Sequence, residues 1–140
     1  MIGLPNKYLI LNGAIVLVMG LLTGLPLRQA IIGAKPDPIR AWRVAHSVFV
    51  MDGLMMLIIG LIIPHLILDE LATWVLVGSL VASGYGFVLA FTVGAFKGLR
   101  GLTAKPFGLN TLLFAAHVIG ASGSLIGSVI VIYGSLKAIS

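Results

Sequence analysis

The chain contains no cysteine and very few charged residues. The lack of cysteine excludes a disulfide framework, thiol chemistry and zinc held by cysteine. Charged residues make up only 9% of the 140 residues, and only 4 residues are acidic. A soluble domain carries about 25% charged residues. Because 59% of this chain is hydrophobic, polar groups cannot cover its surface, and we expect a membrane protein.

Four apolar segments are long enough to cross a bilayer, whose hydrocarbon core of about 30 Å takes about 20 helical residues. We expect these helices at residues 8–27, 39–63, 71–96 and 109–136. The pattern predicts an all-α membrane protein whose four helices pack as a bundle, with residues 1–140 forming one integral membrane domain. Pro26 is expected to bend or end the first helix, because proline removes a backbone donor and crowds the preceding turn.

Small residues recur at helical spacing in three of the four segments. They are Gly20 and Gly24 in the first, Gly78, Ala82 and Gly86 in the third, and Gly120, Gly123 and Gly127 in the fourth. Such spacing gives a helix a small face, on which a neighbouring helix can approach closely. We therefore expect close helix packing through these faces.

The basic residues gather in two connecting loops. Arg28, Lys35, Arg40 and Arg43 lie around the first loop, against Asp37, and Lys97, Arg100 and Lys105 lie in the second. The opposite side has only Lys7 and Lys137, against Asp69 and Glu70. We expect a protein of the cell inner membrane. The positive-inside rule predicts that loops 28–43 and 97–106 lie in the cytoplasm and both termini outside. We interpret the basic residues behind the net charge of +5 as residues that orient the protein and contact the lipid bilayer, and we expect no nucleic-acid partner.

Three ionisable side chains are expected at membrane depth: His46, Asp52 and His117. Such groups are expensive to bury in a bilayer unless they are paired or hydrated, so they indicate a functional site by default. Asp52 follows His46 by six positions, which places it about 9 Å deeper in the same helix. The alternative interpretation is that each side chain only forms a hydrogen bond to a neighbouring helix.

His46 is the candidate metal ligand of this group. A lone histidine does not predict a zinc site, but a neutral imidazole can be the single proximal ligand of a haem. The haem macrocycle is apolar and suits helices with glycine and serine faces, whereas its propionates are anionic. Arg40, Arg43 and Arg100 are expected at the same membrane edge as His46, where they would pair with those propionates.

Several stretches of the chain resemble the styrene oxide isomerase family. They are Trp42-Arg-Val-Ala-His46-Ser47, Asp52-Gly-Leu-Met-Met56, Arg100-Gly-Leu-Thr103 and Phe107-Gly108. The resemblance implies a homotrimeric four-helix membrane protein with haem b held between neighbouring subunits and His46 as the iron ligand. The family reaction converts small apolar aryl epoxides to aldehydes, by Lewis-acid ring opening and a 1,2-hydride shift.

The chain departs from the family at three positions in the expected site. The family has asparagine at the position of Asp52, aspartate at that of Ser83 and tyrosine at that of Phe91. In the family these side chains are thought to orient the substrate and to aid ring opening. Phenylalanine cannot donate the hydrogen bond of a tyrosine, so Asp52 or Tyr85 would have to substitute for it. The candidate catalytic residues are therefore Asp52, Ser83, Tyr85 and Phe91.

Two other functions remain open from the sequence. A non-catalytic membrane haem protein, for small-ligand sensing, electron transfer or haem storage, is favoured by the missing tyrosine and aspartate. It would be favoured further if His117 were a second axial ligand, because that ligation closes the open coordination position. The other alternative is a small transporter or accessory membrane subunit without a cofactor.

Overall fold

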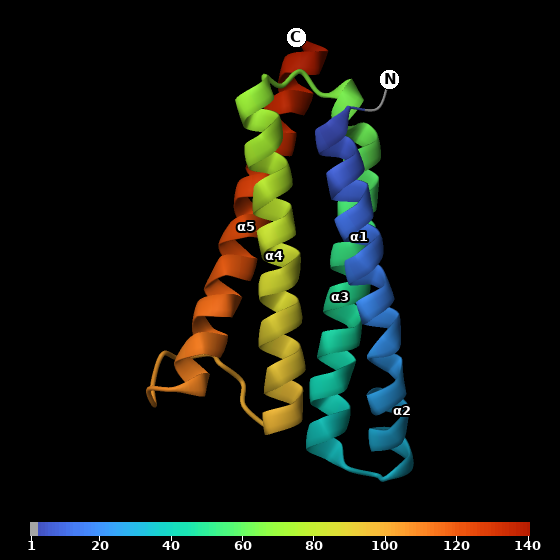
Figure 1. The fold of residues 1–140 in the computed structure, drawn as a ribbon, viewed down its shortest axis with the longest axis vertical. Helices are drawn as coiled ribbons and strands as arrows, with labels where there is room; N and C mark the ends of the chain where they lie inside the picture. Colours follow the sequence, from blue (N-terminus) through green and yellow to red (C-terminus); the bar gives the residue numbers. More distant parts are fainter. Residues whose placement is uncertain (1–2) are drawn as a thin grey trace.

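The chain folds into long helices, as the apolar segments predict. The computed structural model describes residues 3–140, which form helices and their connections and contain no strand. The elements are α1 (Leu4–Leu22), α2 (Gly24–Ile32), α3 (Pro36–Ile62), the short 3-10 helix η1 (Ile63–His65), α4 (Glu70–Lys97) and α5 (Leu109–Ile139) (Figure 1). They make 4 stretches long and apolar enough to cross a membrane. The predicted all-α membrane fold with four spans is confirmed.

The first span consists of two helices separated by a break. α1 begins at Leu4, earlier than expected, because Pro5 occupies the first turn, where its missing N–H removes no helical hydrogen bond. The break falls at Thr23, one turn before Pro26. Pro26 has no N–H for the carbonyl group of Leu22, and its ring crowds that group. The expected interruption near Pro26 is present, but the expected helix end at residue 27 is wrong, since the chain continues as α2 to Ile32.

Local signals set the ends of the later helices. α3 begins at Pro36, three residues before the expected start, because proline is well tolerated in a first turn. The Asp69 carboxylate caps α4 by accepting a hydrogen bond from the backbone N–H of Ala72 at 2.7 Å. α4 ends at Lys97, and the next residue, Gly98, has a φ of 66°, the left-handed conformation typical of the position after a helix end.

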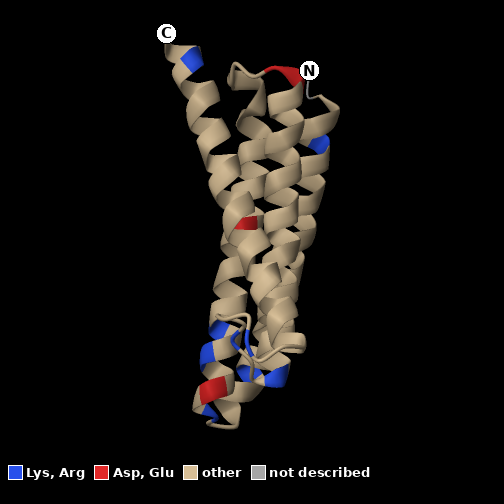
Figure 2. Cartoon of the chain, turned by 90° about the vertical axis from the view of Figure 1, so that its left-hand side faces the viewer, with Lys and Arg blue, Asp and Glu red and all other residues tan. Residues whose placement is uncertain are grey.

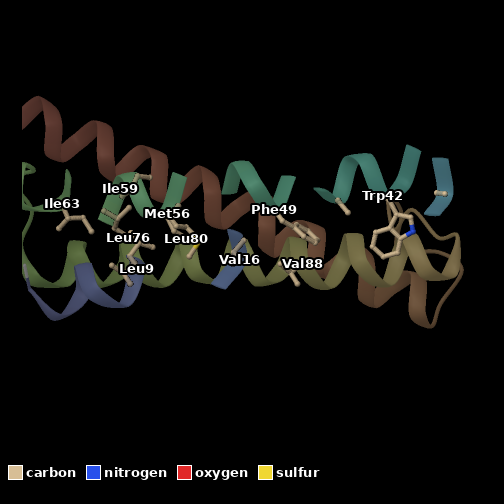
Figure 3. Close-up of a cluster of buried hydrophobic side chains, with 13 residues drawn as sticks. Leu9, Val16, Trp42, Phe49, Met56, Ile59, Ile63, Leu76, Leu80 and Val88 are labelled. Atoms are coloured by element: carbon tan, nitrogen blue, oxygen red, sulfur yellow. The ribbon is translucent and has the colours of Figure 1, made fainter. Parts of the chain in front are cut away.

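The helices pack as two close pairs. α1 lies along α3, and α5 lies along α4 (Figure 1). α3 and α1 also contact α4, and these contacts join the pairs into one bundle. Apolar side chains from α1, α3 and α4 fill the centre, among them Leu9, Val16, Phe49, Met56 and Leu80 (Figure 3). Many large apolar side chains face outward, as contact with lipid requires.

Glycines bring the paired helices close together. A Cβ atom on Gly53 of α3 would lie 2.6 Å from the backbone nitrogen of Leu17 and 2.8 Å from the Gly13 carbonyl oxygen of α1. On α5, Gly120, Gly123 and Gly127 are buried against α4. The predicted small face of α5 is thus confirmed. The predicted face on α4 is only partly used, because Gly86 contacts α5 whereas Gly78 faces open space.

The charged residues divide between the two ends of the bundle. Lysines and arginines gather at the end that holds the α2–α3 and α4–α5 connections (Figure 2). The described N-terminal residues and the C-terminus lie together at the opposite end, with Asp69 and Glu70 (Figures 1 and 2). Of the two acidic residues of α3, Asp37 lies in its first turn, at the basic end, and Asp52 lies near the middle of the helix. The predicted gathering of both basic loops at one end of the bundle is therefore present in the fold.

Gly53→Ala should destabilise the protein because its methyl group would collide with the backbone of α1. Overpacking of this kind costs about 1–3 kcal/mol. Thermal unfolding of the detergent-purified protein measures the loss. Gly78→Ala is the matched control, since nothing lies within 4 Å of its added Cβ. If both substitutions lower the melting temperature equally, the close contact between α1 and α3 is contradicted.

Candidate functional site

His46 faces α1 and the break that follows it. Its Nδ1 lies 2.8 Å from the Gly20 carbonyl oxygen and 3.4 Å from Oγ1 of Thr23. Because a carbonyl oxygen can only accept, Nδ1 carries the hydrogen and donates it to Gly20. In the neutral ring, Nε2 then keeps its lone pair. Gly24 lies beside the ring: a Cβ on this residue would be in ordinary van der Waals contact with Cε1 of His46, at 3.8 Å.

The local fold explains why this carbonyl group meets His46. Gly20 lets α1 approach α3 closely, because a Cβ on Gly20 would lie only 2.8 Å from the backbone nitrogen of Val50. Thr23, at the break, donates its hydroxyl hydrogen to the same carbonyl oxygen. The interrupted helix therefore presents one carbonyl oxygen to two side-chain donors. Sequence reasoning missed Gly20 and Thr23 as partners of His46, and Pro26 was the only signal of a break near them.

A cavity of about 580 Å³ lies between the start of α3, the end of α4, the loop after α4 and α5. Its lining is mostly apolar, with charged groups at the basic end of the bundle. The residues that line it include Arg40, Val44, Phe91, Leu99, Arg100 and His117. Its size falls within the range of about 300–1,000 Å³ that is typical of small-molecule sites.

His117 is the histidine that lines this cavity. Its Nδ1 lies 2.9 Å from the Leu113 carbonyl oxygen, one turn earlier in α5. By the same reasoning as for His46, Nδ1 donates and Nε2 is the free nitrogen. The His117 ring meets Phe91 edge to face, with ring centroids 4.8 Å apart. The ring centroid of Phe91, on α4, lies 6.5 Å from that of Phe49, on α3. Phe49 follows His46 by three residues, so Phe91 lies at a similar level of the bundle to His46.

The structure divides the predicted cofactor residues between two sides of α3. His46 faces α1 and α2, whereas Arg40 and Arg100 line the cavity beside α4 and α5. Arg43 is exposed and does not line that cavity. His46 and His117 do not contact the same groups within the described residues. The described chain therefore does not bring the predicted iron ligand and all the predicted propionate partners together in one place.

Asp52 lies in the packed centre of the bundle. Its side chain is only 7% exposed, and its Oδ2 has no hydrogen-bond partner among the described residues. Gly84 of α4 faces it, and a Cβ on that glycine would be 3.5 Å from Oδ2. A buried carboxylate group without a partner is costly, so this oxygen is available to any donor that reaches it.

Ser83 and Tyr85 form hydrogen bonds between helices. Ser83 donates to the Gly120 carbonyl oxygen of α5 at 2.7 Å, and its oxygen lies 2.6 Å from that of Ser124. Tyr85 donates to Oδ1 of Asn12 on α1 at 2.9 Å. Neither side chain lines the cavity. Their catalytic roles stay predictions, and the observed contacts give both residues a structural role.

Comparison with known proteins supports one family. A protein-family model described as styrene oxide isomerase matches residues 5–136, nearly the whole chain. No curated protein matches the chain. No solved structure matches it.

Ser83→Ala should lower stability by about 1 kcal/mol, because it removes the hydrogen bonds that join α4 to α5. Ser122→Ala is the control, since Ser122 bonds only to carbonyl groups of its own helix. Thermal unfolding in detergent compares the two variants. Unchanged stability of Ser83→Ala together with lost turnover would instead assign Ser83 a direct chemical role.

Proposed function

The chain belongs to the styrene oxide isomerase family, and on that basis we propose that it is a haem b-dependent membrane isomerase. Its substrates would be small apolar aryl epoxides, which it would convert to aldehydes. Such epoxides partition into lipid, so an integral membrane enzyme meets them where they accumulate.

The hydrogen bond of His46 is the observation that supports haem ligation most directly. A histidine that binds a metal usually donates its other ring N–H to a carbonyl or carboxylate group, which fixes the tautomer and the ring orientation. The bond from Nδ1 to the Gly20 carbonyl oxygen has this form, and Nε2 would then be the atom that binds the iron. The chain therefore fits haem at His46, and the iron would supply Lewis-acid chemistry to a bound epoxide oxygen.

We propose that the complete site combines two subunits of a homotrimer. The support is the division described above, in which His46 and the cavity lie on different sides of α3. His46 of one subunit would face the cavity of its neighbour. Arg40 and Arg100 of that cavity would then hold the haem propionates, and Arg43 would assist at the same basic edge. Bidentate pairing of guanidinium with carboxylate groups suits this task.

The other residues of the cavity would hold the substrate. Phe91 and Val44 supply apolar walls for an aromatic ring. Such walls also exclude water, which would otherwise hydrolyse the opening epoxide to a diol. Asp52 does not line this cavity, so its contact with the reacting groups stays a prediction, for which its unpaired Oδ2 is the candidate atom. Ser83 and Tyr85 would support the site by holding the helices in place.

We also propose the orientation of the protein. Both basic loops lie at one end of the bundle. By the positive-inside rule, that end would be cytoplasmic, in the inner membrane, and both termini would be outside. The haem propionates would then be near the cytoplasmic surface.

A non-catalytic haem-binding protein is the second candidate. It is supported by Phe91, which has no hydroxyl group, and by Ser83, whose hydroxyl group is occupied by a hydrogen bond to α5. Sensing, electron transfer or haem storage would need only the ligand and the propionate partners.

The test begins with the visible spectrum of protein purified in detergent after expression with adequate haem. We expect a Soret band and conversion of styrene oxide to phenylacetaldehyde. His46→Ala should lose the band and the activity together, because it removes the iron ligand. His65→Ala is the matched control, since His65 is exposed at the opposite end of α3, within η1.

Each result separates the candidate functions. A wild-type protein without a Soret band excludes both haem proteins and favours the transporter or accessory subunit. A Soret band without aldehyde from any aryl or alkyl epoxide favours the non-catalytic haem protein. Haem retained by His46→Ala shows that the assigned ligand is wrong.

A further inference from the structure

The cavity beside α5 is lined by His117, whose Nε2 has no hydrogen-bond partner among the described residues. Most of its walls are apolar side chains, such as Ala90, Phe91, Ala95 and Leu102. Its charged residues, Asp37, Arg40 and Arg100, come from the start of α3 and the loop after α4, at the basic end. His117 is the polar side chain that α5 contributes to the lining.

The state of the His117 ring follows from its hydrogen bond. Nδ1 donates to the Leu113 carbonyl oxygen, so Nε2 of the neutral ring is an acceptor. The described residues provide no hydrogen-bond donor to Nε2, and this atom is not among the buried polar atoms sealed off without a partner. Nε2 is therefore an accessible acceptor on a side chain that lines a mostly apolar cavity. A ligand that leaves it unpaired loses the hydrogen bond that Nε2 makes with water.

This acceptor distinguishes between possible ligands. An epoxide oxygen is itself only an acceptor, so a simple aryl epoxide has nothing to donate to Nε2. A hydroxyl group donates one hydrogen bond and would pair with Nε2, while the aromatic ring packs against Phe91. An analogue that lacks the donor binds more weakly to such a site, because the polar group of the site is left unpaired.

We infer that the cavity binds small aromatic molecules that carry a hydroxyl group, with His117 Nε2 as the acceptor. For the proposed reaction, this names the substrate class as hydroxylated aryl epoxides. The hydroxyl group would position the molecule and would not react, so it would remain in the aldehyde product. This second statement depends on the proposed function, whereas the binding preference depends only on the cavity.

The test compares two ligands that differ by one hydroxyl group, 2-phenylethanol and ethylbenzene. Their affinities are measured by saturation-transfer NMR on the full-length protein, as purified, in lipid nanodiscs. His117→Leu should weaken the binding of 2-phenylethanol about five- to tenfold relative to the binding of ethylbenzene. This factor corresponds to the loss of one hydrogen bond. Using the ratio of the two affinities cancels their partition into lipid, which is equal for wild type and variant.

Two further variants make the result specific. His117→Gln retains an acceptor oxygen and should recover most of the preference for 2-phenylethanol. His65→Leu, outside the cavity, should leave both affinities unchanged. The inference is overturned if His117→Leu changes the affinities for both ligands by the same factor, or changes neither affinity.

The same measurement separates this inference from the proposed function, because it requires neither turnover nor haem. If the preference for the hydroxyl group depends on His117 but the protein has no isomerase activity, the binding site is supported and the proposed reaction is wrong. If the protein is an isomerase but shows no such preference, the inference is wrong and the proposed reaction stands.

Discussion

The hydrogen bond from His46 to the Gly20 carbonyl oxygen is the contact on which the proposed site depends. It exists because α1 and α3 approach at glycine contacts and because the first span breaks at Thr23, before Pro26. The bond fixes which imidazole nitrogen keeps a lone pair. A feature of helix packing thus determines the chemistry that His46 can perform.

The division of polar groups between two sides of α3 has a consequence for assembly. His46 faces α1 and α2, and the cavity with Arg40, Arg100 and His117 faces α4 and α5. Each chain therefore has the proposed ligand on one side and the pocket on the other. In the proposed homotrimer, the ligand of one copy would meet the pocket of the next, and a closed ring would use every such pair.

The sequence was sufficient to predict the fold but only part of the candidate site. Hydropathy predicts the four spans, and the spacing of Gly120, Gly123 and Gly127 predicts the small face of α5. The contacts of His46 were not predictable, because the rotation of α3 against α1 depends on packing. For the same reason, the prediction from the sequence put Arg40, Arg43 and Arg100 in one group with His46, since all four were expected at the same membrane edge. Tyr85 gave no sign that it would bond to Asn12 on α1.

Co-expression of two inactive variants tests most directly whether the site is shared between subunits. His46→Ala removes the ligand, and Val44→Trp fills the cavity. A mixed oligomer contains some sites with an intact His46 from one subunit and an intact cavity from its neighbour. We predict that each variant alone is inactive and that co-purified mixed oligomers regain haem and epoxide isomerisation. Mixed oligomers that assemble and remain inactive would contradict a site built from two subunits.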